Sequence, residues 1–377
     1  MSHDLYATIS CLSQEDVDRI VSGQIGRQKI PDIYTRIQLL APALLREERW
    51  NRVRGKDYAH DKYQGLVFKL PDHRHTVYAT ELIAKVRDNL MSEGTLGLWQ
   101  PVIPDLSTLP ACSTFLQFRF TLSTPYLSRD DETFHINNNP VRKDKVFKVP
   151  MVAGTAWKGN LHWTGVHLAI LKWQQHQNVA TFADERFRLA RLFGDEKGEE
   201  GAQVQDLAKY LDEQSPQAAK LYRQKVRDHF LITGNTLPHH SGHLRFYPTF
   251  FDRISLEAIN PHERATRAGK QPIYFESIPA GAIGVFSLFY VSFNDVSEAE
   301  ARADLALVAD AIREMMLTYG FSAKRSSGFG EANDDLAEGK IVTATGQWPL
   351  TTLSTLKNEV NHVQWSERAG AAGAGAG

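Results

Sequence analysis

The sequence has few cysteines and no long hydrophobic run. Its 377 residues include only two cysteines, Cys11 and Cys112. Because they are about a hundred residues apart and no second pair exists, we expect neither a zinc cluster nor a disulfide framework. No metal site is expected unless the chain is an active nuclease. No apolar run approaches the roughly 20 residues that span a bilayer, and the first residues lack the layout of a signal peptide. These absences predict a cytoplasmic protein without membrane contact.

An excess of charge of one sign is also missing. The formal net charge is −1, with 42% hydrophobic and 23% charged residues. This balance argues against a protein that coats nucleic acid over its whole surface, but it is compatible with a local basic groove. The composition is typical of globular proteins, and the length fits one large or two ordinary domains.

A glycine-rich loop follows a helical stretch near the C-terminus, at residues 317–330. Glycines permit positive φ and close backbone approach, cations supply charge, and serines supply hydroxyl donors. The residues that provide these groups are Gly320, Gly328, Gly330, Lys324, Arg325, Ser322, Ser326 and Ser327. Such a loop suits a phosphate chain, although its composition also fits an ordinary turn with two solvated cations.

A second anion-binding pattern lies near the middle of the chain. Residues 149–152 predict a short strand, Gly154 and Thr155 a turn, and the following residues a helix to about Gln175. Free N–H groups and a positive dipole end mark the start of such a helix, and Lys158 stands on its first turn. The spacing of a Walker loop is absent. Further along, the residues expected to face the core are Trp163, Val166, Ile170, Leu171 and Trp173.

Two polar segments hold further candidates. One contains Asp130, Asp131 and His135, which could place a divalent ion or move a proton, but the composition favours a solvated loop. Asp144, in the same segment, is a further candidate acid. Arg142 and Lys143 in the same segment are candidate RNA contacts. The other is a basic tract interleaved with aromatic residues, which predicts RNA contact or a solvated helix; its main candidates are Arg49, Arg52 and Arg54.

The remaining pattern predicts an α+β chain. Helices are expected at residues 181–193 and 216–230, with an exposed acidic loop at 194–201 between them. Strands are expected at 114–122, 244–246, 271–277 and 283–293. Capping boxes predict one helix after Ser13 and another after Ser297.

Four motifs occur in order along the chain. They are Ala-Gly-Thr-Ala-Trp-Lys-Gly-Asn-Leu at 153–161, Leu-Phe-Gly-Asp at 192–195, Gly-His-Leu-Arg-Phe at 242–246 and the glycine-rich loop at 320–330. Together they resemble the RAMP superfamily of CRISPR-associated proteins, over about residues 114–333. The resemblance implies a ferredoxin-like βαββαβ core, related to the RNA recognition fold, with helical insertions and an additional N-terminal region.

The resemblance also implies a function. Members of the superfamily stack along a guide RNA in type III effector complexes of the Csm and Cmr kind, so the implied partners are crRNA, target RNA and other subunits. The implied RNA-contacting residues are Gly154, Thr155, Lys158, Gly320, Lys324, Arg325, Ser326, Ser327 and Gly328. Binding of this kind requires no cofactor.

The chain departs from the family pattern at two places. The usual Pro-Gly-Ser-Ser turn is Ala-Gly-Thr-Ala at 153–156, and the position of the RNA-cleaving aspartate aligns with Asn138. Because an amide cannot act as a carboxylate base, we expect no cleavage by the usual loop. Two alternatives stay open: an endoribonuclease that uses Mg or Mn with Asp130, Asp131 or Asp144, and a protein-interaction module without RNA contact.

The expected organisation has three parts. Residues 1–112 form an N-terminal extension with helices and the basic tract, and residues 113–345 form the RNA-binding domain. Residues 346–377 form a C-terminal segment that ends in a flexible Ala/Gly tail at 369–377.

Overall fold

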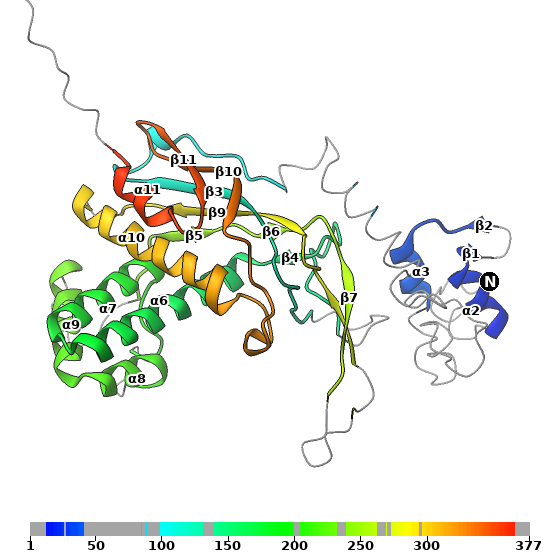
Figure 1. Ribbon diagram of the computed structural model, residues 1–377, viewed down its shortest axis with the longest axis horizontal. Coiled ribbons are helices and arrows are strands. Elements are labelled where there is room, and N and C mark those ends of the chain that lie inside the picture. The colour runs from blue at the N-terminus through cyan, green and yellow to red at the C-terminus, as the bar shows by residue number, and fades with distance from the viewer. Residues whose placement is uncertain are drawn as a thin grey trace, which may run out of the picture.

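A five-stranded antiparallel sheet forms the centre of the protein (Figure 1). The computed structural model describes residues 13–25, 28–40, 84, 88, 99–130, 139–199, 204–231, 239–261, 269, 273–293 and 296–365. The strand order in the sheet is β11-β10-β3-β9-β5. The strands are β3 (Thr114–Thr121), β5 (Leu244–Phe246), β9 (Ile283–Tyr290), β10 (Asp335–Val342) and β11 (Gln347–Thr352).

Helices cover one face of this sheet. α6 (Gly154–His176) and α10 (Glu298–Glu314) lie against it, and α11 (Leu356–His362) packs on α10 (Figure 1). Three helices are inserted between α6 and β5, where α7 packs on both α6 and α9. They are α7 (Val179–Phe193), α8 (Asp206–Gln214) and α9 (Pro216–His229).

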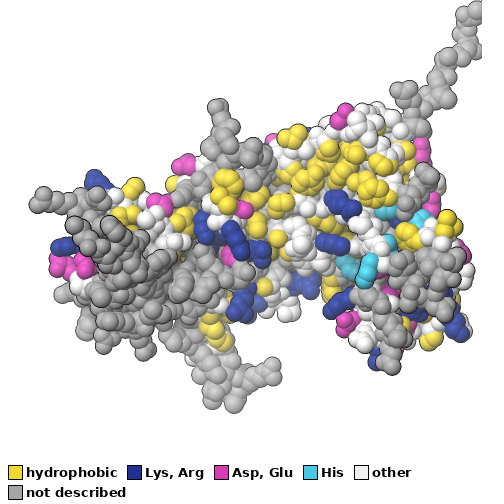
Figure 2. Space-filling model, turned by 180° about the vertical axis from the view of Figure 1, so that it is seen from behind, with side chains coloured by type: hydrophobic (Ala, Val, Ile, Leu, Met, Phe, Trp, Pro, Cys, Tyr) yellow, Lys and Arg dark blue, Asp and Glu magenta, His cyan; other side chains and the backbone are white. Residues whose placement is uncertain are grey.

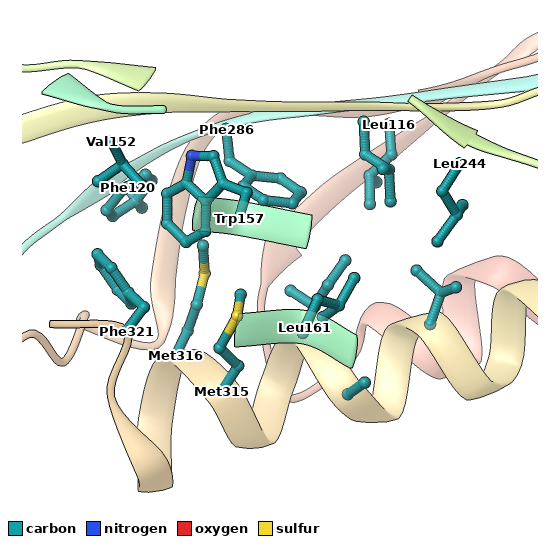
Figure 3. Close-up of a cluster of buried hydrophobic side chains, with 14 of the residues drawn as sticks. Leu116, Phe120, Val152, Trp157, Leu161, Leu244, Phe286, Met315, Met316 and Phe321 are labelled. Carbon is teal, nitrogen blue, oxygen red and sulfur yellow. The ribbon is translucent and has the colours of Figure 1, made fainter. Parts of the chain in front are cut away.

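The core between sheet and helices is centred on Trp157, on the first turns of α6. Its buried ring lies 6.2 Å from Phe120 of β3 and 5.0 Å from Phe286 of β9, measured between ring centroids. Met316 and Phe321 close the other side, and the Phe321 ring is 4.7 Å away (Figure 3). A buried tryptophan contributes a large apolar area and cannot move without creating a cavity. Trp157 therefore fixes the start of α6 relative to the sheet and to residue 321.

The second face of the sheet carries a smaller cluster. Leu106, Phe115, Phe289 and Val291 are buried there, under the segment at 99–112 that includes the short helix η2 (Leu106–Thr108). The view from behind shows hydrophobic side chains gathered on the surface of this part of the protein (Figure 2).

Two smaller pairs of strands flank the sheet. β4 (Met151–Val152) pairs with β6 (Thr249–Phe250), and β7 (Ser255–Ile259) pairs with β8 (Ile273–Ser277). The β7–β8 hairpin projects away from the sheet (Figure 1).

A separate group of short elements lies near the N-terminus. It consists of α2 (Gln14–Val21), β1 (Gln24–Ile25), β2 (Gln28–Lys29) and α3 (Ile33–Leu40). The Tyr34 hydroxyl donates to the Lys148 carbonyl at 2.8 Å, which joins this group to the rest of the chain.

Most of the expected helices and strands are present, and the α+β fold class is confirmed. The capping boxes at Ser13 and Ser297 are both present, with α2 and α10 after them. The expected strands correspond to β3, β5, β8 and β9, and the expected helices correspond to α6, α7 and α9, although no prediction was made for α8. Residues 346–365 add β11 and α11 to the same sheet and helical layer. No helix in the described ranges is long and apolar enough to cross a bilayer.

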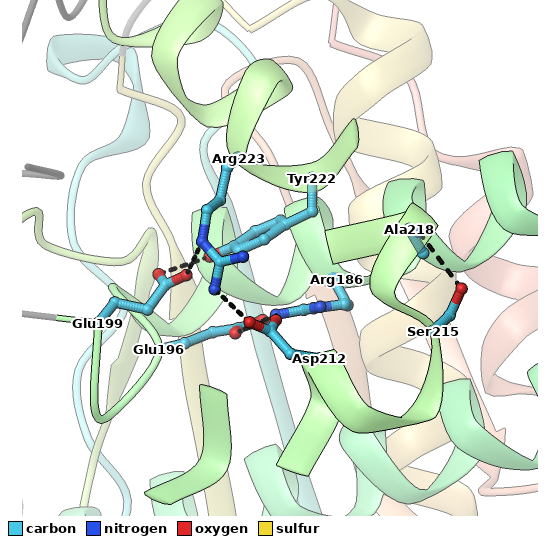
Figure 4. A network of polar contacts seen from close by, with 8 residues as sticks. All are labelled: Arg186, Glu196, Glu199, Asp212, Ser215, Ala218, Tyr222 and Arg223. Carbon is cyan, nitrogen blue, oxygen red and sulfur yellow. Dashed lines mark hydrogen bonds and ion pairs between the residues drawn. The ribbon is translucent and has the colours of Figure 1, made fainter. Parts of the chain in front are cut away.

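The expectation of an exposed acidic loop at 194–201 is wrong for Glu196 and Glu199; residues 200 and 201 lie outside the described residues. The Glu196 side chain is 3% exposed, and its carboxylate binds the buried Arg186 guanidinium at 2.7 and 3.1 Å. Glu199 is 5% exposed and accepts a hydrogen bond from the Tyr222 hydroxyl at 3.0 Å (Figure 4). These contacts attach the loop to the inserted helices. The acids look solvated in the sequence because their partners on α7 and α9 are distant in the chain.

Candidate nucleic-acid interface

The first turns of α6 present a surface without negative charge. The N-cap residue Ala153 has no side chain that can cap the helix, and the first turn contains no acid. The first amide N–H groups of a helix have no intrahelical acceptor, so this end is electropositive. Thr155, Lys158 and Trp163 are exposed on these turns.

Gly154 has a packing role at the same place. A β-carbon at this position would lie 2.5 Å from the Phe246 carbonyl oxygen of β5, which is closer than atoms can approach. The glycine is therefore required for α6 to start against β5, whether or not an anion binds beside it.

The glycine-rich loop is fixed at both ends by backbone contacts. The Phe321 N–H donates to the Gly330 carbonyl at 3.0 Å, and the Gly330 N–H donates to the Pro125 carbonyl at 2.8 Å. The buried Ser322 hydroxyl accepts from the Leu127 N–H at 2.7 Å. Ser322 was grouped with the hydroxyls of the loop in the sequence, but it holds the base of the loop instead. A π-helical turn, η3 (Met315–Tyr319), leads from α10 into this loop.

The exposed tip of the loop lies between these anchors. Lys324 adopts a left-handed conformation with φ of 60°, and the 3₁₀ turn η4 (Arg325–Ser327) follows it. Ser326 and Gly328 are exposed at this tip. Gly328 has φ of 77° and open space around the position of a β-carbon. The tip is therefore accessible to a large ligand.

Two cation–π contacts connect the tip to neighbouring elements. The Arg325 guanidinium carbon is 4.3 Å from the Trp163 ring centroid on α6, and the Lys324 ammonium is 5.3 Å from the Phe275 ring centroid on β8. The Asn160 side-chain amide also donates to the Phe321 carbonyl at 3.3 Å. The loop is thus held between α6 and the β7–β8 hairpin.

The three cations of this surface keep uncompensated charge. Neither Lys158 nor Lys324 nor Arg325 forms an ion pair with a carboxylate in the described part of the chain. Burial, with a smaller contribution from Lys158, lowers the pKa of His162 to about 4, so this ring adds no charge at neutral pH. We call Thr155, Lys158, Lys324, Arg325, Ser326 and Ser327 the cationic surface.

The four sequence motifs lie side by side in the structure. Residue 154 contacts residue 246, and a β-carbon on Gly242 would lie 2.3 Å from the Leu192 carbonyl oxygen. The His243 N–H donates to the Arg191 carbonyl at 3.0 Å, and the loop reaches the first motif through Asn160. Motifs that are far apart in the sequence therefore form one contiguous unit.

Among the other candidates, Lys143 does not reach the surface. Its side chain is 1% exposed, and its ammonium pairs with the fully buried Glu276 carboxylate. The expectation of an RNA contact at Lys143 is therefore wrong, because the amine is enclosed in the interior. Arg142 is exposed, as a candidate contact should be.

The acids of the polar segment take part in local structure. The Asp130 carboxylate accepts from the Lys143 N–H at 3.1 Å, and the Asp144 carboxylate accepts from the Val146 and Phe147 N–H groups in a turn. Within the described ranges, no group of three or more His, Cys, Asp and Glu side chains is placed to hold a metal ion. The remaining candidates lie outside the described residues: Asp131, Asn138, Arg49, Arg52 and Arg54.

Three residues beside the cationic surface were not expected there. Trp163 was expected to face the core, but it is 42% exposed, and Tyr319 and Phe275 carried no sequence signal. No spacing rule pairs Trp163 with Arg325, because they meet only after the sheet and helices assemble. The sequence offers one indirect signal for Trp163 as a surface residue, namely its place on the same first turns of the helix as Lys158.

Comparisons with known proteins give structural neighbours only. No family model and no curated protein sequence matches the chain. A chain of the type III-B Cmr-β complex bound to cognate target RNA is 14% identical with a TM-score of 0.42, and the match covers 88% of this chain and 100% of that one.

Two further neighbours are similar in kind. A chain of the Csm3–Csm4 subcomplex of the type III-A interference complex is 10% identical with a TM-score of 0.34, over 67% of this chain and 96% of that one. Methanopyrus kandleri Csm3 is 16% identical with a TM-score of 0.33, over 61% and 76%. Such values are too low to establish a shared fold.

Proposed function

We propose that the chain is a structural subunit of a type III CRISPR effector ribonucleoprotein and that it binds the guide RNA through the cationic surface. The observation on which this depends is the position of Lys158, Lys324 and Arg325 where the start of α6 meets the glycine-rich loop. Among the residues that the structure describes, none of the three has a carboxylate partner. Exposed hydroxyls beside them can donate to phosphate oxygens, and contacts of this kind are independent of base sequence.

The strand order supports the ferredoxin-like part of the proposal. Four strands of the sheet and the two helices that cover it follow one another in the chain as β3, α6, β5, β9, α10 and β10. Helices α7–α9 are inserted between α6 and β5. In the sheet these strands lie in the order fourth, first, third and second. This order supports the proposed βαββαβ arrangement that the family resemblance implies.

Charge reversal at the loop tip tests the proposal. Lys324→Glu combined with Arg325→Glu should strongly weaken binding of single-stranded RNA. The plot of log K against log salt should also become less steep by at least about 1.4, since each lost phosphate contact on a single strand removes about 0.7 from the magnitude of the slope. The matched control is Lys209→Glu with Lys220→Glu, which makes the same change in net charge on α8 and α9.

The outcomes separate the alternatives. If the loop variant and the control have the same affinity and salt slope, the assignment of the loop is wrong. If the wild-type chain binds no RNA at all, the chain is better explained as a protein-interaction module. Equal affinity for RNAs of unrelated sequence is expected, because the proposed contacts are to the backbone.

A further inference from the structure

An aromatic side chain next to the cationic surface has no structural reason to be exposed. Trp163 is 42% exposed, whereas Trp157 on the same helix is fully buried. Exposing a tryptophan leaves a large apolar area in contact with water, which is unfavourable unless a partner covers it. Trp163 is therefore a candidate contact for a flat, partly apolar ligand.

The ring is held rigidly by two neighbouring aromatic side chains. The Trp163 and His167 rings are nearly parallel, 9° apart, with centroids at 5.2 Å. Tyr319, from η3, packs perpendicular to both at 5.4 and 5.2 Å. A side chain fixed in this way loses little conformational entropy when a ligand stacks on it.

A cation lies over the ring and a second stands on the same helix. Arg325 is 4.3 Å from the Trp163 centroid, and its Nη1 atom is buried without a hydrogen-bond partner in the described part of the chain. Lys158 precedes Trp163 by five residues, which is about 7.5 Å along the helix axis. Cations that follow a phosphate backbone, together with an aromatic or guanidinium plane for a base, are the combination that binds single-stranded nucleic acid.

We propose that an unpaired RNA nucleobase stacks on the exposed part of the Trp163 ring, next to the Arg325 guanidinium that lies over it, while the adjoining phosphates contact Lys158 and the tip of the glycine-rich loop. This inference rests on the proposed RNA-binding function and adds a specific base-binding position to it. Stacking is tolerant of base identity because every base has a flat π face. The contribution of Trp163 to affinity is therefore independent of salt and of sequence, unlike that of the neighbouring cations.

The test measures the affinity of the full chain for an oligouridine of about 16 nucleotides and for the same oligomer without bases. Trp163→Ala should weaken binding of oligouridine by about 5- to 150-fold and leave the salt slope unchanged. Trp163→Phe should retain most of the affinity. For the oligomer without bases, the loss in Trp163→Ala should be much smaller and limited to the effect of the missing Arg325 contact on the loop, because no base is present to stack.

Tyr210→Ala is the matched control. Tyr210 is 47% exposed on α8, so the variant removes a similar exposed aromatic side chain from a helix remote from the loop. Its affinity for both oligomers should equal that of wild type. If Trp163 acted only by holding the loop, Trp163→Ala would weaken binding of both oligomers by the same factor, and that result would overturn the stacking proposal.

Cross-linking gives a readout that does not depend on any variant. RNA that contains 4-thiouridine should cross-link to the tryptic peptide of residues 159–172, which contains Trp163. If Trp163→Ala does not fold, absence of this cross-link refutes the proposal. If Trp163→Ala binds normally while the double variant at residues 324 and 325 does not, stacking is refuted and the proposed function stands. If neither variant alters RNA affinity, both are wrong.

Discussion

Replacing Glu199 by glutamine should stabilise the protein above pH 7. Burial, together with repulsion from Glu196, raises the pKa of Glu199 from its ordinary value of 4.5 to about 7. The native state therefore binds a proton more tightly than the unfolded chain between these values, so stability falls as pH rises from 4.5 to 7. At about 1.36 kcal/mol for each pH unit, ionisation of Glu199 costs on the order of 3 kcal/mol.

Glutamine resembles the protonated carboxyl group. Its carbonyl oxygen can still accept from the Tyr222 hydroxyl, and Arg223 keeps its ion pair with Asp212 at 2.7 Å. Glu199→Gln should therefore match wild type near pH 4.5 and exceed it by up to about 3 kcal/mol above pH 7.

Urea unfolding at pH 5, 6, 7 and 8 measures this difference, provided that the m-values of the two proteins agree. Glu213→Gln is the control, because that side chain is 63% exposed and should leave the pH dependence unchanged. A glutamine variant that is less stable than wild type at pH 8 would refute the reasoning. It would show that the ionised form of residue 199 is stabilised by its neighbours.

Three further predictions concern the buried network, the loop and the acids. Arg186→Met should lower the free energy of unfolding in urea by about 3 to 5 kcal/mol, because it leaves a buried carboxylate without its cation. Gly330→Ala places a β-carbon 2.2 Å from that of Ser322 at φ of 80°, so it should displace the loop and weaken RNA binding at least tenfold in filter binding. Gly328→Ala, at φ of 77° in open space, should cost only about 1 kcal/mol and leave binding nearly intact, and equal losses for both variants would contradict the loop geometry. Target RNA should stay intact with Mg²⁺ or Mn²⁺, and Asp130→Ala should change nothing; cleavage that stops with EDTA or with this variant would establish the nuclease alternative.

Local patterns predict the framework of this fold well. A capping box with an apolar stripe after Ser297 is sufficient to define α10, because both signals depend only on neighbouring residues. The apolar run of β3 likewise predicts a strand, and its burial pattern agrees with a position inside the sheet. The cations of the cationic surface could be selected for the same reason, since each follows a turn or helix start in the sequence.

Contacts between distant segments could not be predicted. Lys143 resembles a solvated cation in its polar segment, yet it meets Glu276 from β8 in the interior. Trp163 resembles a core residue, yet the sheet and α10 cover only part of α6, and Arg325 lies on its ring instead. Both errors arise because residue type predicts preference for burial, whereas tertiary packing decides which side chains are covered.

Analysis of the RNA that copurifies with the protein tests the central claim most directly. Wild-type protein, isolated with its natural partner subunits, should contain bound RNA of uniform length that contacts the cationic surface in cross-linking. The same preparation with Lys324→Glu and Arg325→Glu should lose these cross-links and most of the RNA bound to this subunit. Cross-links of equal strength in the two preparations would contradict the proposed role of the glycine-rich loop, and absence of any RNA from the wild-type preparation would contradict the proposed function itself.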